Sequence, residues 1–200
     1  VLADIDAAGL DQTATAVRAL GAQTLAVPAD ISDAAACLAV APRAVEEFGR
    51  LDAVCNVAGA FRFDHATAIT PEVWDRIHGV NVRGPFFIIQ AAMPFLIESA
   101  GAVVNVASAS AFLGHAYLTH YASSKAALVN LTKSLAMEFI NAPVRINAVA
   151  PGGINTAMTS GGSIPEGIDF QLVGRYSPMR GSAEPEELTE APRLPNEPET

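Results

Sequence analysis

Residues 101–149 decide the fold and read GAVVNVASASAFLGHAYLTHYASSKAALVNLTKSLAMEFINAPVRINAV. The run VVNV within Gly101–Ala107 is the most strand-like of the chain and predicts a fully buried strand. Alanine, leucine and valine recur at helical spacing over His120–Phe139, and Arg145–Val149 predicts another strand. A strand, a helix and a strand in this order are typical of a βα unit with a parallel sheet.

The same alternation extends back to the first residue. Further strands are predicted at Val1–Ile5, Thr24–Val27 and Ala53–Asn56, and further helices at Ala7–Leu20, Asp33–Phe48 and from Pro71 to about Ile97. Ser32 is the expected N-cap of the second helix, whereas Pro85 and Pro94 are expected to bend or interrupt the third. The pattern predicts an α/β fold class: a three-layer, Rossmann-like, doubly wound parallel sheet.

The C-terminal part has a different composition. Residues 156–174 are rich in Gly, Ser and Pro and show weak periodicity, which is typical of a substrate lid. A short helix is expected to begin near Ser182. Residues 189–200 place Pro192, Pro195 and Pro198 among acidic side chains and predict a disordered tail. We therefore expect one domain over residues 1–188.

Charge and composition exclude several classes of partner. Twelve Lys and Arg against 21 Asp and Glu give a net charge of −9, which argues against nucleic acid or an anionic membrane surface. No apolar run approaches the roughly 18 residues of a membrane span, and without a signal-peptide pattern we expect a cytoplasmic location. Cys37 and Cys55 are expected to be small, reduced core side chains. The histidine spacing indicates no metal site.

Two residues on the helix predicted at His120–Phe139 suggest proton chemistry. Lys125 follows Tyr121 by four residues, so both side chains leave one helix face about one turn apart. A nearby ammonium favours the phenolate of a tyrosine that must exchange a proton near neutral pH. A chance pairing of these two residues is the alternative.

Two further residues add to this pair. Ser108 lies just past the carboxyl end of the strand VVNV, where open parallel sheets bind ligands. Its hydroxyl is a candidate to hold a substrate oxygen, or else it bonds its own backbone. Asn81 lies in GVNVRG near Gly79 and Gly84, where a bent helix can hold a proton-relaying water. A solvated helix asparagine is the alternative for that residue.

Several motifs together resemble the short-chain dehydrogenase/reductase family from Val1 to about Leu188. They are Tyr121-Ala-Ser-Ser-Lys125, Ser108, NVAG at Asn56–Gly59, Asn81 and PGGINT at Pro151–Thr156. The resemblance implies that Tyr121 is the catalytic acid/base and that Lys125 holds the nicotinamide ribose and lowers the tyrosine pKa. It also implies that Ser108 orients the substrate oxygen and that Asn81 anchors a relay water. The implied chemistry is hydride transfer between a nicotinamide and a carbon that bears a hydroxyl or carbonyl.

The first strand indicates the form of the cofactor. Asp4 would lie at its carboxyl end, where a carboxylate accepts hydrogen bonds from the adenosine ribose hydroxyls. A 2′-phosphate would meet like charge there, and no Arg follows Asp4 directly, so NAD is favoured over NADP. Asp6 is the competing carboxylate, although its position is typical of a helix N-cap.

The resemblance extends the cofactor site along the chain. Asp30 and Ile31 should flank the adenine, with an Asx-turn as the alternative for Asp30. Ile154 and Thr156 should meet the nicotinamide carboxamide. The full set of predicted cofactor-binding residues is Asp4, Asp30, Ile31, Asn56, Ala58, Gly59, Tyr121, Lys125, Pro151, Gly152, Ile154 and Thr156.

The chain also departs from the family pattern. Family members begin with a strand and a glycine-rich turn that cradles the pyrophosphate, and neither is present here. That strand would lie between those starting at Val1 and Ala53, so we expect an incomplete N-terminus and a gap of about 10 Å. These 200 residues alone are therefore not expected to bind dinucleotide tightly. After AEPEEL, the acidic tail replaces the family's apolar helix and last strand.

The leading hypothesis is an NAD-dependent oxidoreductase that interconverts a secondary alcohol and its ketone. The expected pocket near Phe61, Ser110, His115 and Tyr117 lacks an obvious cationic anchor, which favours a small neutral substrate. The first alternative is a reductase of acyl-carrier-bound ketones, for which Arg76 and Arg83 are a candidate basic patch. The second is a non-catalytic scaffold or inactive fragment. The resemblance implies a homodimer or homotetramer for the parent protein.

Overall fold

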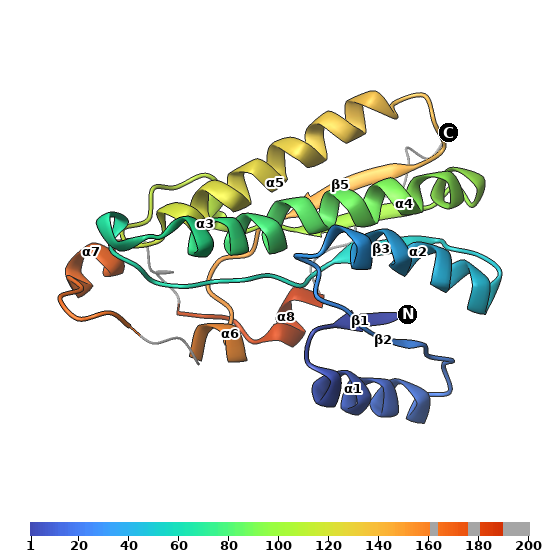
Figure 1. Ribbon diagram of the computed structural model, residues 1–200, viewed down its shortest axis with the longest axis horizontal. Coiled ribbons are helices and arrows are strands. Elements are labelled where there is room, and N and C mark those ends of the chain that lie inside the picture. The colour runs from blue at the N-terminus through green and yellow to red at the C-terminus, as the bar shows by residue number, and fades with distance from the viewer. Residues whose placement is uncertain (161–163, 176–180, 190–200) are drawn as a thin grey trace.

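The computed structural model describes residues 1–160, 164–175 and 181–189. Its strands are β1 (Leu2–Asp4), β2 (Ala26–Pro28), β3 (Ala53–Asn56), β4 (Ala102–Val106) and β5 (Arg145–Val149). All strand pairs are parallel, which confirms the predicted α/β class (Figure 1). The predicted tail at residues 189–200 lies outside the described residues, apart from its first position.

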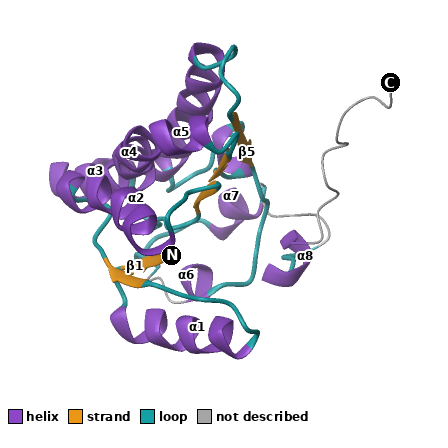
Figure 2. Ribbon diagram, turned by 90° about the vertical axis from the view of Figure 1, so that its right-hand side faces the viewer, coloured by secondary structure: helices purple, strands orange, loops and turns teal. Residues whose placement is uncertain are grey.

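Helices cover both sides of the strands. They are α1 (Ala7–Ala19), α2 (Ala34–Phe48), α3 (Pro71–His78), α4 (Gly84–Glu98), α5 (Thr119–Glu138), α6 (Ala157–Ser160), α7 (Phe170–Gly174) and α8 (Pro185–Thr189). Figure 2 shows α2, α4 and α5 on one side of the strands and α1 on the other. The main core lies between α2, α4 and the strands β4 and β5, with Ile89, Leu96 and Val103 almost fully buried.

The strands form two sheets, as the predicted gap in the parallel sheet requires. β1 pairs with β2, and β3, β4 and β5 form a separate sheet in that order. Among the described residues no strand lies between β1 and β3, where the gap was expected. A cavity of about 830 Å³ lies there instead, lined by residues of both strands and of α2. The neighbouring helices therefore hold the two sheets in place without a shared ladder.

The sequence predicted the N-cap of α1 correctly but not that of α2. Asp6 caps α1, as expected, through a hydrogen bond from the Ala8 N–H at 3.1 Å. The N-cap of α2, however, is Asp33 and not Ser32, because the Asp33 carboxylate accepts from the Ala35 N–H at 3.0 Å. Pro94 was predicted to bend or interrupt the long helix. It does not interrupt it, because α4 continues through this residue.

The segment Pro71–Glu98 forms one helical stretch of 28 residues through α3, a π-helical turn at Gly79–Arg83 and α4. By length and composition alone this stretch is apolar enough to cross a membrane, contrary to the sequence-based expectation. Half of its most apolar window is buried inside the fold, against α2 and the strands. Its apolar character is therefore that of a core helix.

The two cysteines differ in their surroundings. Cys37 is fully buried on α2, and its Sγ donates to the Ile31 carbonyl at 3.1 Å. Cys55 on β3 is exposed and lines the cavity. The expectation of two core cysteines is therefore wrong for Cys55, because the edge of β3 that faces the cavity is left uncovered.

Candidate active site

The π-helical turn Gly79–Arg83 places the amide of Asn81 inside the protein. Asn81 is 1% exposed, and its Oδ1 accepts from the Ala60 N–H at 2.8 Å. Its Nδ2 donates to the Ala60 carbonyl and to Ser124 Oγ, each at 2.9 Å. The solvated-asparagine alternative is therefore wrong. The amide ties the loop after β3 to α5, and its role as a water anchor stays a prediction.

Ser108 and Tyr121 meet as the sequence predicts. Ser108 follows the end of β4, and its Oγ accepts from the Ser110 N–H at 3.1 Å, which is the local bond considered as an alternative. The same side chain also hydrogen-bonds the Tyr121 phenol. Burial raises the pKa of Tyr121, and the bond with Ser108 offsets part of that rise. Ser108 is thus positioned to favour the phenolate.

Lys125 lies beside the tyrosine ring. Its Nζ is 5.9 Å from the Tyr121 ring centroid and donates to the Val106 carbonyl at 2.7 Å. The side chain is almost fully buried, and burial lowers the pKa of Lys125 to about 8. The expected lowering of the tyrosine pKa by this ammonium is not found, because burial raises the pKa of Tyr121 and the lowering contribution comes from Ser108 and not from Lys125.

Gly59 marks the place where these groups converge. A Cβ built on Gly59 would lie 3.4 Å from Asn81 Oδ1, 3.6 Å from Lys125 Nζ and 3.6 Å from Met158 Cε. Gly59 was predicted to let a cofactor come close to the backbone. The absent side chain leaves space there beside two polar groups of the site, Asn81 Oδ1 and Lys125 Nζ. Phe61 closes another side, with its ring edge-on to Tyr121 at 5.0 Å between centroids.

Asn56 has a structural task that the sequence analysis missed. Its Nδ2 donates to Asn105 Oδ1 at 2.8 Å, and Asn105 Nδ2 donates to Thr132 Oγ1 at 2.9 Å. All three residues are buried. This chain of side chains joins β3, β4 and α5 beneath the site. The Asn56 amide nitrogen is therefore engaged within the protein.

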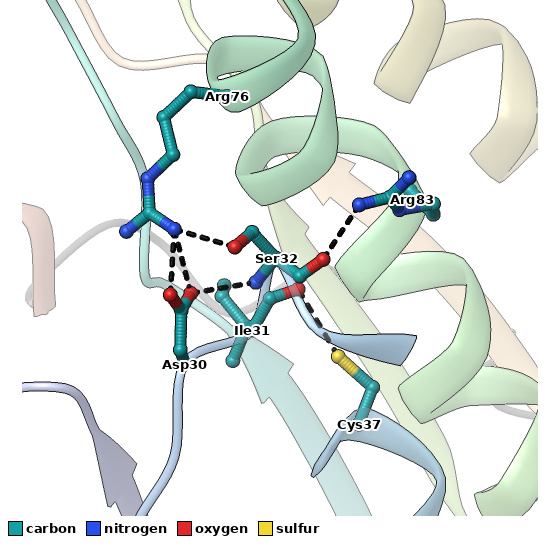
Figure 3. Close-up of polar contacts among 6 residues, drawn as sticks. All are labelled: Asp30, Ile31, Ser32, Cys37, Arg76 and Arg83. Atoms are coloured by element: carbon teal, nitrogen blue, oxygen red, sulfur yellow. Dashed lines mark hydrogen bonds and ion pairs between the residues drawn. The ribbon is translucent and has the colours of Figure 1, made fainter. Parts of the chain in front are cut away.

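Asp30 and Ser32 are held by two arginines from the long helix (Figure 3). Arg76 Nη1 donates to both carboxylate oxygens of Asp30, at 2.7 and 2.8 Å, and to Ser32 Oγ. The Ser32 N–H also donates to Asp30 Oδ1 at 2.9 Å, which is the predicted Asx-turn geometry. These bonds lower the pKa of Asp30. Arg83 Nη2 donates to the Ser32 carbonyl at 2.6 Å.

The remaining cofactor-binding predictions fall in two places. Asp4, Ile31, Ala58 and Gly59 line the cavity between the sheets, together with Asn56. The segment Pro151–Thr156 follows β5 and is tied to its surroundings through backbone bonds, among them one from the Ala109 N–H to the Pro151 carbonyl at 2.8 Å. Ile154 bridges to Ala183 near α8. No contact of Pro151, Gly152, Ile154 or Thr156 with the cavity is found among the described residues.

The sequence analysis also missed a group of polar side chains beside the tyrosine, formed by His120, Asp64 and Arg62. His120 is fully buried, and its Nε2 lies 3.2 Å from Asp64 Oδ2. Arg62 Nε lies 3.0 Å from Asp64 Oδ1. Burial lowers the pKa of His120 more than Asp64 raises it. The sequence signal was limited to a histidine next to Tyr121, because Asp64 lies 56 positions earlier in the chain.

The predicted lid, residues 156–174, is described except for residues 161–163. It contains α6 and α7. The Asp169 N–H donates to the Tyr117 hydroxyl at 3.1 Å, and His65 Nε2 lies 2.9 Å from the Glu166 carbonyl. Both aromatic side chains come from loops beside the site, so this segment packs against them.

Comparisons with known proteins show the family to which the chain belongs. The sequence model of a family described as enoyl-(acyl carrier protein) reductase matches residues 1–192. Galactitol 2-dehydrogenase of Agrobacterium fabrum is 34% identical over 157 residues, 78% of this chain and 60% of that protein. A 3-oxoacyl-acyl-carrier-protein reductase of Thermotoga maritima is 31% identical over 191 residues, 95% of this chain and 76% of that protein.

A solved structure gives the same result. A protein of Sinorhizobium meliloti assigned as a short-chain alcohol dehydrogenase superposes with a TM-score of 0.75 at 33% identity, covering 80% of this chain and 64% of that one. The chain thus spans about 60% of the galactitol dehydrogenase and of that solved structure. Sequence model, relatives and fold agree that the chain belongs to the short-chain dehydrogenase/reductase family.

Proposed function

We propose that this chain carries the proton-transfer site of an NAD-dependent oxidoreductase that interconverts a small, neutral secondary alcohol and its ketone. The observation that carries the proposal is the convergence of Tyr121, Ser108 and Lys125 at the carboxyl end of β4. Two of the relatives, galactitol 2-dehydrogenase and meso-2,3-butanediol dehydrogenase of Serratia marcescens, are named for alcohol substrates.

The residues present fit a nicotinamide cofactor at one end of the cavity. Gly59 leaves open the space that a Cβ would fill beside Asn81 and Lys125. Lys125 has three N–H donors, and one of them is engaged by the Val106 carbonyl. Asp4 lines the cavity and offers a carboxylate for ribose hydroxyls. Asp4, Gly59 and Lys125 are therefore the residues that would hold the cofactor, and the Asp4 charge supports NAD rather than NADP.

Tyr121 transfers the proton. When an alcohol is oxidised, the phenolate oxygen takes the hydroxyl proton of the substrate, and when a ketone is reduced, the phenol returns it. The Ser108 hydroxyl holds the substrate oxygen within reach of Tyr121. The nicotinamide, when bound, supplies the hydride chemistry. A protonated Lys125 stabilises the phenolate by Coulomb attraction, which matters more in a buried site than in water.

The acyl-carrier reductase remains the second candidate, supported by the Thermotoga relative, which covers 95% of this chain. The basic patch expected for an acidic carrier is, however, committed to other contacts. Arg76 binds Asp30, and Arg83 binds the Ser32 carbonyl. The small neutral substrate is therefore favoured.

Turnover with a panel of small secondary alcohols tests the proposal, at NAD concentrations high enough to allow for the weak dinucleotide binding that is expected of these 200 residues alone. We expect oxidation that Tyr121→Phe abolishes while the folded-state spectrum is unchanged. A preference for acyl-carrier-bound ketones would support the second candidate. A biological activity that survives Tyr121→Phe would support the scaffold alternative.

A further inference from the structure

Tyr121 lies in the part of its helix that is hardest to hold in place. The helix α5 begins at Thr119, so the tyrosine belongs to its first turn. The first N–H groups of a helix have no partner within the helix, and a polar side chain at the N-cap commonly binds one of them. The N-cap of α5 is Leu118, whose apolar side chain cannot accept a hydrogen bond. Another contact must therefore keep this turn, and the tyrosine with it, beside Ser108.

The backbone directly before α5 is strained. Tyr117 has a φ of 65°, in the left-handed region that residues other than glycine seldom adopt. Such a conformation persists where the surrounding contacts enforce it. The carbonyl of Tyr117 accepts the N–H of Asp64 at 3.0 Å, and Asp64 belongs to the segment between β3 and α3. This segment therefore helps to fix the turn from which α5 starts.

The side chain of Asp64 contacts the same helix. Asp64 is 5% exposed, and its Oδ2 lies 3.2 Å from Nε2 of His120, the residue directly before Tyr121. Its Oδ1 lies 3.0 Å from Arg62 Nε. A buried carboxylate needs polar partners of this kind, and a negative charge at the N-terminus of a helix is favourable. Asp64 thus joins its loop to the start of α5 through both its backbone and its side chain.

The same loop covers the tyrosine. The ring of Phe61 meets the ring of Tyr121 edge-on, with 5.0 Å between centroids. The loop is held at Ala60, whose N–H and carbonyl both bond the Asn81 amide. Asp64 is a second anchor of the loop, on the other side of Phe61. The place of the Phe61 ring over the tyrosine therefore depends on both anchors.

We propose that Asp64 is a positioning residue of the proton-transfer site, which holds the first turn of α5 and the Phe61 ring where they bring the Tyr121 phenol to Ser108. It acts through its contacts with α5 and with its own loop, and not on the reacting atoms. The proposal rests on the proposed function, because Tyr121 is taken as the proton carrier. Its two main measurements nevertheless use no turnover.

The first measurement is the pKa of Tyr121 in the variant Asp64→Ala, which loses the carboxylate but keeps the N–H that bonds Tyr117. The chain is labelled with ¹³C at the tyrosine Cζ, and Tyr121→Phe assigns the signal. Because burial raises the pKa of Tyr121, a loosened loop that admits water should lower it toward its ordinary value. A residue that only stabilised the fold would leave the pKa of the folded chain unchanged.

The second measurement is amide exchange at the start of α5, followed by NMR on the ¹⁵N-labelled chain. The N–H of Ala122 donates to the Leu118 carbonyl across the first turn. We expect this amide to exchange at least about tenfold faster in Asp64→Ala, because the turn opens more often. The N–H of Phe139, bonded to Leu135 at the far end of the helix, is the internal control and should change little.

A conservative variant should restore part of the effect. Asp64→Asn keeps the shape and an acceptor oxygen but can offer that oxygen to only one of Arg62 and His120. Ala122 should therefore exchange only about threefold faster than in the unchanged chain. If Asp64→Ala does not fold, Asp64→Asn decides the question by itself.

The matched control is Asp52→Ala. It removes the same group from the ion pair with Arg50, whose side chains are 71% (Arg50) and 54% (Asp52) exposed, at the opposite end of β3 from the site. Neither the Tyr121 pKa nor the Ala122 exchange rate should change in this variant.

Turnover separates this proposal from the proposed function. If the unchanged chain oxidises secondary alcohols, Asp64→Ala should lower kcat about 10- to 100-fold and change KM less, because Ser108 still holds the substrate oxygen. If it does not, the proposed function is wrong, and the two NMR measurements still decide whether Asp64 holds Tyr121 in place.

Two outcomes would overturn the proposal. One is an unchanged Tyr121 pKa and an unchanged Ala122 exchange rate in the Asp64 variants, even where their stability falls, which would leave Asp64 a structural role alone. The other is the same change in Asp52→Ala, which would assign the effect to the net charge of the chain.

Discussion

The sheet β3–β4–β5 and the sheet β1–β2 differ in how their polar groups are satisfied. Beneath the first, Asn56, Asn105 and Thr132 form a continuous buried chain of hydrogen bonds, and Asn81 is engaged on both sides of its amide. The second sheet has three-residue strands and an unpaired edge. The residues that we propose for proton transfer all belong to the first region, whereas Asp4 and Asp30, which we propose for nucleotide binding, belong to the second. The proposed chemistry therefore lies in the region whose buried polar groups are hydrogen-bonded to one another, and the proposed nucleotide recognition lies in the region with the short strands.

The largest effect is expected at the tyrosine. Tyr121→Phe removes the proposed proton carrier and should lower turnover by about 10²–10⁴-fold. Ser108→Ala should lower turnover by less, because the tyrosine remains. Steady-state kinetics measures both effects, and thermal unfolding serves as the control for folding. Retained turnover in Tyr121→Phe would remove the basis for assigning the chemistry to the β3–β5 region.

The buried ammonium of Lys125 should make stability depend on pH. Because its pKa is about 8 in the folded chain and 10.5 ordinarily, the unfolded chain binds more protons between these values. Stability should therefore rise with pH from 8 toward 10, and the charge should cost the fold up to about 3 kcal/mol below pH 8. Lys125→Met should lose this dependence in urea unfolding at several pH values. If the free energy of unfolding depends on pH in the same way in Lys125→Met and in the unchanged chain, this prediction is wrong.

The contact between the two regions depends on a glycine. A Cβ at Gly84, where α4 begins, would clash with the carbonyl of Ile31, which follows β2. Gly84→Ala should therefore lower the free energy of unfolding by about 1–3 kcal/mol. Gly114 is the matched control, because a Cβ there meets nothing within 4 Å. Denaturant unfolding measures the free energy of unfolding of both variants. Equal values would show that the contact between Gly84 and the Ile31 carbonyl can rearrange without loss of stability.

The smallest effect is expected at the ion pair in Figure 3. The side chains of Arg76 and Asp30 are 44% and 39% exposed, so Arg76→Ala should change stability by at most about 1 kcal/mol. The pKa of Asp30 should rise toward its ordinary value, because the arginine helps to lower it. An NMR titration of the Asp30 carboxyl tests this, and an unchanged pKa would assign the whole shift to the Ser32 N–H.

The sequence predicted the helices and strands better than the side-chain contacts between them. β3 and β5 were predicted at their observed limits, because apolar runs between turn residues identify buried strands. The meeting of Ser108 with Tyr121 was predicted from motif order. The partners of Asn81 and the pair Asp64–His120 were not, because they join residues 21 to 56 positions apart and leave no local periodicity.

The sequence by itself determined the α/β alternation, the helix that carries Tyr121 and Lys125 on one face, and the placing of Ser108 after a buried strand. These follow from local periodicity and chain order. Only the tertiary structure decided that burial lowers the Lys125 pKa and raises that of Tyr121, and that Arg76 and Arg83 are committed to Asp30 and Ser32. Desolvation and ion pairing depend on which distant segments meet, and packing alone fixes that.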